Sequence, residues 1–258
     1  MHLLRACAVN ALCKYGLNGS DQFSNLRLIT VAKKKRVSGE FIFTENNDRE
    51  LEFVGDFEGL YRDFKNPWSQ SANGTSDPDW TNYYDVSRTK IGKKINSYGE
   101  SHNVLEIGCG LGFALDLFAK NAKNSTFFGM DISHIAIQKA GKSFPNYSFF
   151  QGDITSKNMN FKKKYNIVIF SQVLWYILEN LDLAMSNAHK LIKTDGYLLI
   201  SQAFLREQRY GKNIIDGYSG TLEYLRERQQ NKFLVVSAQS DPYEKLSLDD
   251  GLIVSKKV

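Results

Sequence analysis

The chain has 258 residues, of which 42% are hydrophobic and 24% are charged, values that are ordinary for a globular protein with a buried core and exclude a mainly disordered one. Lysine and arginine exceed aspartate and glutamate by 33 − 28 = 5, a mild excess spread along the chain. We interpret the one dense basic run, residues 33–36, as a solvated turn, so nucleic acid is not an expected partner.

Cysteine usage and hydropathy bear on where the protein works. The cysteines at positions 7, 13 and 109 give neither an even set nor a Cys-x-x-Cys pair, which favours a reducing compartment. The first residues lack the basic start and sustained apolar run of a signal peptide, and no stretch approaches the ~20 apolar residues of a membrane span. We therefore expect a soluble, cytoplasmic monomer or homodimer without a metal site.

The first hundred residues differ from the rest in their pattern of apolar and polar residues. Segments 26–31, 40–44 and 50–54 alternate apolar and polar residues, which predicts strands, with turns at Ser38-Gly39 and Asn46-Asn47-Asp48. Residues 1–58 are thus predicted to form a β-containing appendage. Residues 59–100 form an aromatic lid segment, in which 69–79 is predicted as a loop and 86–98 as a helix.

From residue 101 to 258, strands and helices alternate. Strands are expected at 103–108, 125–131, 147–152, 166–171 and 197–204, and helices at 113–122, 135–142, 181–192 and 221–230. Ser133 is the predicted N-cap of one helix, and Gly196 is the predicted stop after another. Segments 233–237 and 251–254 would pair as final strands around a loop at Asp241-Pro242. The alternation predicts an α/β fold, a parallel sheet with helices on both faces.

A glycine-rich turn follows the first of these strands and opens a helix. Gly108, Gly110 and Gly112 permit a tight turn and close approach of a ligand to the backbone. The dinucleotide pattern G-x-G-x-x-G fails because its last position is Phe113, and the Gly-Lys-Ser/Thr of a P-loop is absent. With Glu106 ahead of it, the turn resembles the first motif of class I S-adenosylmethionine-dependent methyltransferases.

This resemblance implies a Rossmann-like, seven-stranded, mostly parallel sheet with a final antiparallel hairpin, in which residues 101–258 bind S-adenosylmethionine and release S-adenosylhomocysteine. The glycine loop would wrap the aminocarboxypropyl arm of the cofactor. Asp131, about 20 residues after the loop, can accept the ribose hydroxyls, and an acid at Asp153 would take the adenine amino group. The neighbours Ile132 and Ile154 join this set. Alternatively, either aspartate merely caps a helix or a turn.

The end of the predicted strand 166–171 would place Ser171 and Gln172 beside the methionine arm of the cofactor. Trp175 and Tyr176 would lie near the transferable methyl group and are catalytic candidates, because aromatic faces stabilise positive charge. Their alternative reading is packing under the next helix. None of the four histidines lies where a general base is needed, so the base stays unassigned.

A second resemblance lies ahead of the glycine loop. Phe57-Glu-Gly-Leu-Tyr61, Pro67-Trp68 and Tyr83-Tyr84 are similar to the N-terminal segment of NodS-like methyltransferases, which modify amino sugars and other small molecules; Asn66 replaces the usual acid before Pro-Trp. Trp68 would contact substrate. Tyr84 and Arg88 lie one helical turn apart, and Arg88 would hold the cofactor carboxylate unless it is an exposed helix residue.

The segment after strand five is the expected substrate lid. Arg206, Arg209, Tyr210 and Lys212 suit a phosphorylated or nucleotide-linked substrate, although such basic loops are usually solvated. Residues 208–217 also look like a segment of methyltransferases from bacterial surface-polysaccharide gene clusters. We therefore expect methyl transfer to a hydroxyl or phosphate-type oxygen of a carbohydrate or phosphoramidate precursor of a capsule.

Three alternatives remain open from sequence. One is an N-methyltransferase of an amino sugar. The second is an RNA or protein methyltransferase, although strand four lacks the Asn/Asp-Pro-Pro-Tyr/Phe signature of nucleic-acid amino-group methylases. The third is a catalytically silent binding module, which the intact Glu106, Asp131 and Asp153 disfavour.

Overall fold

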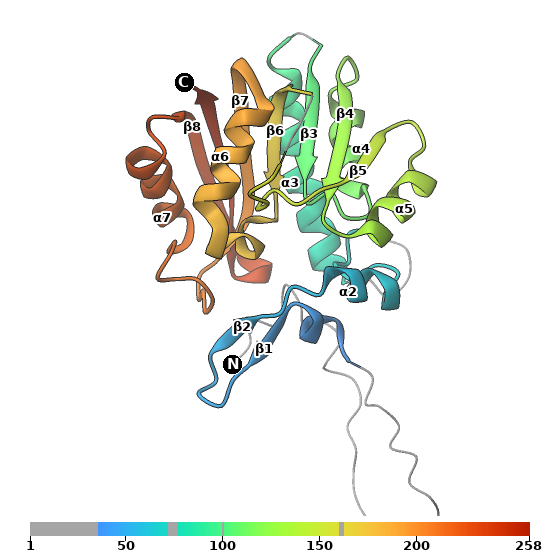
Figure 1. Ribbon diagram of the computed structural model, residues 1–258, viewed down its shortest axis with the longest axis vertical. Coiled ribbons are helices and arrows are strands. Elements are labelled where there is room, and N and C mark those ends of the chain that lie inside the picture. The colour runs from blue at the N-terminus through green and yellow to red at the C-terminus, as the bar shows by residue number, and fades with distance from the viewer. Residues whose placement is uncertain (1–35, 72–76, 100, 160–162) are drawn as a thin grey trace, which may run out of the picture.

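Seven strands form one sheet in the order β5-β4-β3-β6-β7-β9-β8 in the computed structural model, which describes residues 36–71, 77–99, 101–159 and 163–258 (Figure 1). The strands are β3 (Asn103–Ile107), β4 (Thr126–Asp131), β5 (Ser148–Gln151), β6 (Tyr165–Ser171), β7 (Ile192–Leu205), β8 (Phe233–Tyr243) and β9 (Leu248–Lys257). All neighbours pair in parallel except β7–β9 and β8–β9. The predicted Rossmann-like sheet with a final antiparallel hairpin is confirmed.

Both faces of the sheet are covered, because the central strands are apolar at successive positions. Ile167 and Ile169 of β6 pack with the helices α3 (Pro78–Asn96) and α4 (Phe113–Asn121), whereas Val168 and Phe170 pack with α6 (Leu181–Leu191). The helix α5 (His134–Ser143) lies beside β4 and β5, and Ser133 caps it as predicted by accepting a hydrogen bond from the Ala136 N–H. Alternate residues of one buried strand thus anchor opposite helical layers.

The predicted element bounds needed correction at several points. The helix expected at 86–98 begins at Pro78, because Asp77 caps it and a proline suits its first turn. The strand β7 begins at Ile192, and Gly196 lies inside it. The expected loop at Asp241-Pro242 belongs to β8, where a proline is tolerated because β8 is an edge strand.

The helix predicted at 221–230 begins earlier, as α7 (Gly217–Glu223), and continues as a π-helical turn (Tyr224–Arg228). Within the described part of the chain, no helix is long and apolar enough to cross a membrane.

A small hairpin lies at one end of the sheet, below it in Figure 1. Its strands are β1 (Phe43–Glu45) and β2 (Leu51–Phe53), joined by a turn in which Asn46 Oδ1 accepts two backbone N–H groups. The predicted strands at 40–44 and 50–54 and the turn at 46–48 are therefore found in shortened form. Ser38-Gly39 is not a turn but the start of a 3₁₀ helix (Ser38–Phe41), and the strand predicted at 26–31 lies outside the described residues.

A short helix that the sequence reading did not anticipate, α2 (Phe57–Asp63), connects the hairpin to the sheet domain. Asp56 caps it by accepting a hydrogen bond from the Gly59 N–H at 2.9 Å. Glu58 accepts a hydrogen bond from the Ser133 hydroxyl at 2.5 Å, and Lys139 donates to the main-chain oxygens of Tyr61 and Phe64. These contacts fasten α2 to α5, over the carboxyl ends of β3 and β4.

Candidate active site

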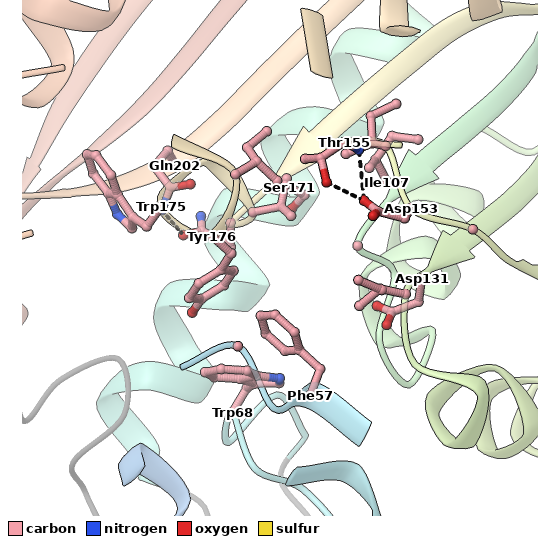
Figure 2. Close-up of a pocket in the computed structure, with 18 of the residues that line it drawn as sticks. Phe57, Trp68, Ile107, Asp131, Asp153, Thr155, Ser171, Trp175, Tyr176 and Gln202 are labelled. Carbon is pink, nitrogen blue, oxygen red and sulfur yellow. Dashed lines mark hydrogen bonds between the residues drawn. The ribbon is translucent and has the colours of Figure 1, made fainter. Parts of the chain in front are cut away.

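The carboxyl ends of the parallel strands open into one cavity, as expected for an open α/β sheet. It holds about 1140 Å³ of space between protein atoms, its solvent-open mouth included. Its lining combines the sheet edge with α2, the hairpin and the segment after β6 (Figure 2). The predicted site residues that line it are Trp68, Tyr84, Gly108, Asp131, Ile132, Asp153, Ile154, Ser171, Gln172, Trp175 and Tyr176.

Gly108 of the glycine loop lines the cavity, Gly110 and Gly112 lie outside the lining, and all three have a left-handed backbone conformation that favours glycine. Gly108, Gly110 and Gly112 have φ of +70°, +52° and +83°. A Cβ on Gly110 would lie 2.5 Å from the hydroxyl oxygen of Tyr61, and one on Gly108 would lie 2.8 Å from Val173. Tyr61 and Val173 therefore pack directly against the loop, and at Gly108 the loop backbone reaches the cavity lining, where a ligand can approach it.

Asp131 ties the loop to the end of β4. One carboxylate oxygen accepts a hydrogen bond from the Gly110 N–H at 2.8 Å, and the other accepts one from the Ser133 N–H at 2.9 Å. The side chain is only 6% exposed. Burial raises the pKa of Asp131 to about 6, against the opposing effect of these two N–H donors. A carboxylate with spare lone pairs thus faces the cavity beside the loop.

Asp153 lies farther along the same sheet edge, after β5. Its Oδ1 accepts hydrogen bonds from the main-chain N–H of Thr155 at 2.8 Å and from the Thr155 hydroxyl at 2.6 Å, drawn as dashed lines in Figure 2. The turn-capping role considered as an alternative is therefore real. It uses one oxygen only, and Asp153 still lines the cavity.

Glu106 and Arg88 are both buried beneath this wall rather than in it. They are 2% and 3% exposed, and the Glu106 Oε2 and the Arg88 Nε find no hydrogen-bond partner among the described residues. Burial raises the pKa of Glu106 to about 8, although the charge of Arg88 acts in the opposite direction. The guanidinium of Arg88 lies over the Tyr84 ring, 4.5 Å from its centroid, so the exposed-helix alternative for Arg88 is wrong.

Aromatic side chains crowd the side of the cavity opposite Asp131. Tyr176 is their centre: its ring centroid lies 5.4 Å from that of Phe57, 5.7 Å from that of Trp68 and 6.4 Å from that of Phe53, with which it stacks (Figure 2 shows Tyr176, Trp68 and Phe57 together). Trp175 lines the wall too, but its indole N–H donates to the Ala203 carbonyl and its ring packs edge-on against Phe204. Trp175 is therefore partly a packing residue, whereas Tyr176 projects toward the cavity.

The basic residues predicted for the lid lie outside the cavity lining. Arg206 pairs with both oxygens of Glu244, at 2.7 and 3.0 Å, and Arg209 pairs with Glu45 of the hairpin at 2.9 Å. Lys212 lies 3.6 Å from Asp216. Each cation therefore already has a carboxylate neighbour.

Tyr210 takes part in the aromatic cluster from the lid side. Its ring centroid lies 5.0 Å from that of Phe43, and its hydroxyl donates to Glu179 at 3.1 Å. The ring contact with Phe43 and the Arg209–Glu45 ion pair together hold the lid segment against the hairpin.

Sequence reasoning assigned no role to several residues of the cavity. Tyr61 is the most consequential: it is 4% exposed, its hydroxyl accepts a hydrogen bond from the Trp68 indole N–H at 2.9 Å, and it lies against Gly110. The available signal was the Phe57–Tyr61 segment itself, whose aromatic ends lie four residues apart on one helical face. Phe53, Thr155, Asn180 and Gln202 had no such signal, because only the fold brings them to the cavity.

A family model described as "Methyltransferase domain" matches residues 99–243, more than half of the chain. Among curated proteins, a polyketide synthase–nonribosomal peptide synthetase of Pyricularia grisea is 33% identical over 147 residues, which cover 52% of this chain and 3% of that protein. A malonyl-[acyl-carrier protein] O-methyltransferase of Ilyobacter polytropus is 28% identical over 170 residues, which cover 59% of this chain and 62% of that protein. The matches thus span less than two thirds of these relatives.

Solved structures share the fold. N-methyltransferase NodS of Bradyrhizobium japonicum aligns with a TM-score of 0.60 at 18% identity, covering 78% of this chain and 97% of NodS. The magnesium protoporphyrin IX methyltransferase of Synechocystis aligns with a TM-score of 0.57 at 16% identity, covering 74% of this chain and 88% of that one. From the family match, the sheet order and the glycine loop together, the chain belongs to the methyltransferase-domain family, as a class I S-adenosylmethionine-dependent methyltransferase.

Proposed function

We propose that this protein transfers a methyl group from S-adenosylmethionine to a small-molecule acceptor held in the aromatic half of the cavity. The observation that carries the proposal is the junction of the glycine loop with Asp131 at the cavity wall, through the 2.8 Å hydrogen bond from the Gly110 N–H. These two features are 21 residues apart in sequence and form one surface. A backbone conformation that favours glycine, next to a buried carboxylate, fits an adenosyl ligand with ribose hydroxyls to donate.

The residues present fit this cofactor along the whole sheet edge. Asp131 and Ile132 would hold the ribose, Asp153 and Ile154 the adenine, and the glycine loop with Ser171 and Gln172 the methionine arm. Tyr84 lines the cavity and would contact that arm, whereas Glu106 and Arg88 are buried outside the lining and would support the arm from behind the loop. Bound S-adenosylmethionine supplies an electrophilic methyl group on a sulfonium ion.

The chain's own contribution to the reaction is positioning and exclusion of water. Methyl transfer is an in-line displacement, so holding the acceptor atom behind the methyl group accounts for much of the acceleration. Tyr176, Trp68 and Phe57 supply apolar faces that displace water and, near a cationic centre, electrostatic stabilisation. We retain Tyr176 and Trp175 as the residues nearest the reacting atoms, and we assign no general base.

The lining also bears on the acceptor. Among the described residues that line the cavity, none is lysine, arginine or histidine, whereas aspartates and aromatic rings are present. A sugar ring presents apolar C–H faces that pack on aromatic rings, with hydroxyls left for polar groups such as Thr155 and Asn180. We therefore propose a carbohydrate hydroxyl as the acceptor, in a precursor of a bacterial surface polysaccharide, ahead of a phosphate-type oxygen or a phosphoramidate.

An amino sugar is the second candidate. The aromatic half of the cavity suits an ammonium group, because ring faces attract a cation and no described lining residue is lysine, arginine or histidine. NodS, which shares the fold, is an N-methyltransferase and supports an amino acceptor, whereas the O-methyltransferase of Ilyobacter polytropus supports a hydroxyl acceptor.

We further propose a division of labour along the chain. Residues 101–258 would bind the cofactor, residues 59–100 would form a lid at the mouth of the cavity, and, of the N-terminal region 1–58, the described residues 36–58 would cover the acceptor. The described part of that cover contributes Phe53, Gly55 and Phe57 to the lining, in support of this division.

Two experiments test the proposal. Calorimetry should show micromolar binding of S-adenosylmethionine and S-adenosylhomocysteine; absence of binding to both would refute it. Incubation with labelled S-adenosylmethionine and matched neutral, amino and phosphorylated sugars, read by mass spectrometry, should give a methylated neutral sugar. Label appearing only in the amino sugar would favour the second candidate.

Paired variants then separate the two candidate acceptor surfaces. Trp68→Ala should raise the acceptor KM while leaving the affinity for S-adenosylhomocysteine unchanged. Arg206→Ala, which breaks an ion pair outside the cavity, is the control. A raised KM in the arginine variant alone would instead assign acceptor recognition to the lid.

A further inference from the structure

Gln172 has an unusual backbone for its position in the cavity wall. It follows the last residue of β6 and lines the cavity, and its φ is +59°, in the left-handed region that a residue with a Cβ rarely adopts. Such strain persists only where the surroundings over-determine it, and it concentrates at functional sites.

One side of Gln172 is fastened to β7. Its main-chain N–H donates to the Ser201 carbonyl at 2.8 Å, and its side-chain Oε1 accepts from the Ala203 N–H at 2.9 Å and from Gln202 Nε2 at 3.3 Å. Gln202 itself is 1% exposed. Because the amide oxygen is committed to β7, the Nε2 group of Gln172 is turned toward α3.

The other side is fastened to a buried tyrosine. Gln172 Nε2 donates to the Tyr83 hydroxyl oxygen at 3.0 Å, and that hydroxyl donates to Asp250 Oδ1 at 3.2 Å. Tyr83 is fully buried, and burial holds its pKa well above the ordinary value, so it keeps the proton that this chain of hydrogen bonds needs.

Asp250 is held in turn from α3. It is 4% exposed, accepts from the Ser87 hydroxyl at 2.8 Å, and pairs through its second oxygen with Lys90 at 2.6 Å. The network therefore joins Gln172, in the cavity wall after β6, to Asp250 of β9 and to the face of α3 that carries Tyr83, Ser87 and Lys90. Neither Tyr83 nor Asp250 lines the cavity.

We propose that Tyr83 and Asp250 are positioning residues: they hold Gln172 in its strained conformation, and thereby shape the wall against which the methyl donor binds. This inference rests on the proposed function, because it assumes that the cofactor occupies the cavity. Two hydrogen bonds support it, one at each end of the Gln172 side-chain amide: Nε2 donates to the Tyr83 hydroxyl oxygen, and Oε1 accepts from the Ala203 N–H. Loss of the hydrogen bond to Tyr83 would allow the Gln172 backbone to leave its left-handed conformation.

The test uses S-adenosylhomocysteine as the probe and calorimetry on the whole chain. Tyr83→Phe should weaken its affinity at least fivefold. The matched control is Tyr224→Phe: Tyr224 is 4% exposed, donates to Asp182 at 2.7 Å and accepts from Gln229 at 2.8 Å, but lies outside the cavity lining. Its affinity should stay within twofold of the wild type. Equal losses in the two variants would mean a general effect of removing a buried hydroxyl and would overturn the inference.

A double-mutant cycle distinguishes a role of Tyr83 that acts through Gln172 from a general structural role. If Tyr83 acts through Gln172, then Tyr83→Phe should cost less than twofold in affinity when Gln172→Ala is already present. Independent losses that multiply would overturn the inference.

Two variants of Asp250 test its part in the network. Asp250→Asn keeps an acceptor for the Tyr83 hydroxyl and should retain affinity for S-adenosylhomocysteine, whereas Asp250→Ala should lose it; wild-type affinity in the alanine variant would remove Asp250 from the network.

The failure of the proposed function is distinguishable from the failure of this inference. A wild-type protein that binds neither S-adenosylmethionine nor S-adenosylhomocysteine refutes both. Tight binding by the wild type, with Tyr83→Phe unchanged, refutes the positioning role alone.

Discussion

Asp131 offers the sharpest test, because its protonation should control cofactor affinity. Its pKa lies at about 6, raised by burial, and only the ionised carboxylate accepts hydrogen bonds from ribose hydroxyls at both oxygens. At pH 5, one unit below this pKa, roughly one tenth of the molecules carry the ionised form. The dissociation constant for S-adenosylhomocysteine should therefore rise about tenfold between pH 7 and pH 5, equivalent to about 1.4 kcal/mol.

The substitution Asp131→Asn keeps the shape of the side chain but removes its negative charge. In Asp131→Asn, one of the two backbone N–H donors, on Gly110 or Ser133, meets an amide NH₂ instead of an oxygen. That mismatch lowers the stability of the folded protein. Affinity falls for a separate reason: the ribose hydroxyls lose a charged acceptor, an interaction worth about 1.5–3 kcal/mol, so affinity at pH 7 should fall about 10- to 100-fold. The remaining affinity should not change between pH 5 and pH 7, because the titrating group is gone.

The stability of the ligand-free protein should respond to pH in the opposite sense. Because the folded-state pKa of Asp131 lies above its ordinary value of 3.8, the folded state binds this proton more tightly than the unfolded state does. Its contribution to stability is full below about pH 4 and is lost as pH rises to about 6, by about 3 kcal/mol for a shift of about two units.

Calorimetric titrations at half-unit pH intervals, paired with chemical unfolding, measure both trends. Asp116→Asn, which changes an aspartate outside the cavity, is the control and should retain the wild-type pH dependence of affinity. Wild-type affinity that is constant from pH 7 to pH 5 would show that Asp131 is not the ribose acceptor.

Two further substitutions probe the glycine loop and the carboxyl group beneath it. Gly110→Ala places a Cβ 2.5 Å from the Tyr61 hydroxyl oxygen at a φ of +52°, and should cost about 1–3 kcal/mol of unfolding free energy and at least tenfold in affinity for S-adenosylhomocysteine. Gly99→Ala, at a φ of +76° with no atom within 4 Å, shares the backbone strain without the contact, and equal affinity losses in the two variants would contradict the role of the loop. Glu106→Gln removes a buried carboxyl group whose pKa is raised from 4.5 to about 8. Between pH 4.5 and pH 8, Glu106 should lower the free energy of unfolding of the wild type by up to about 5 kcal/mol. The variant, measured by urea unfolding, should lose this part of the slope and keep the part that comes from Asp131; an identical slope in both proteins would show that Glu106 is ionised when folded.

The residues that we propose as cofactor ligands could be picked out from the sequence because they lie at or just after strand ends. Gly108, Gly110 and Gly112 follow β3, Asp131 ends β4, and Asp153 follows β5. In a parallel sheet with right-handed crossovers, consecutive strand ends meet at one edge, so spacing along the chain predicts proximity in space. Asp77-Pro78 carried a comparable local signal for the start of α3, which the loop prediction at 69–79 overlooked.

The acceptor half could not be predicted in the same way. Arg206 and Arg209 look like phosphate ligands in the sequence, but their carboxylate partners are 38 and 164 residues away, and an ion pair already formed has little charge left for a substrate. Likewise, Tyr176 becomes the centre of an aromatic cluster only because the N-terminal hairpin places Phe53 against it.

The amino-acid sequence by itself determined the sheet, the glycine loop and the acids at the strand ends, because each depends on residues close together in the chain. Only the tertiary structure decided what faces the acceptor. It placed α2 on α5 so that Tyr61 lies over Gly110, and it joined Tyr83, Gln172 and Asp250 into one buried network. The physical reason is that a charge or a hydroxyl acts according to its neighbours, and these neighbours come from distant parts of the chain.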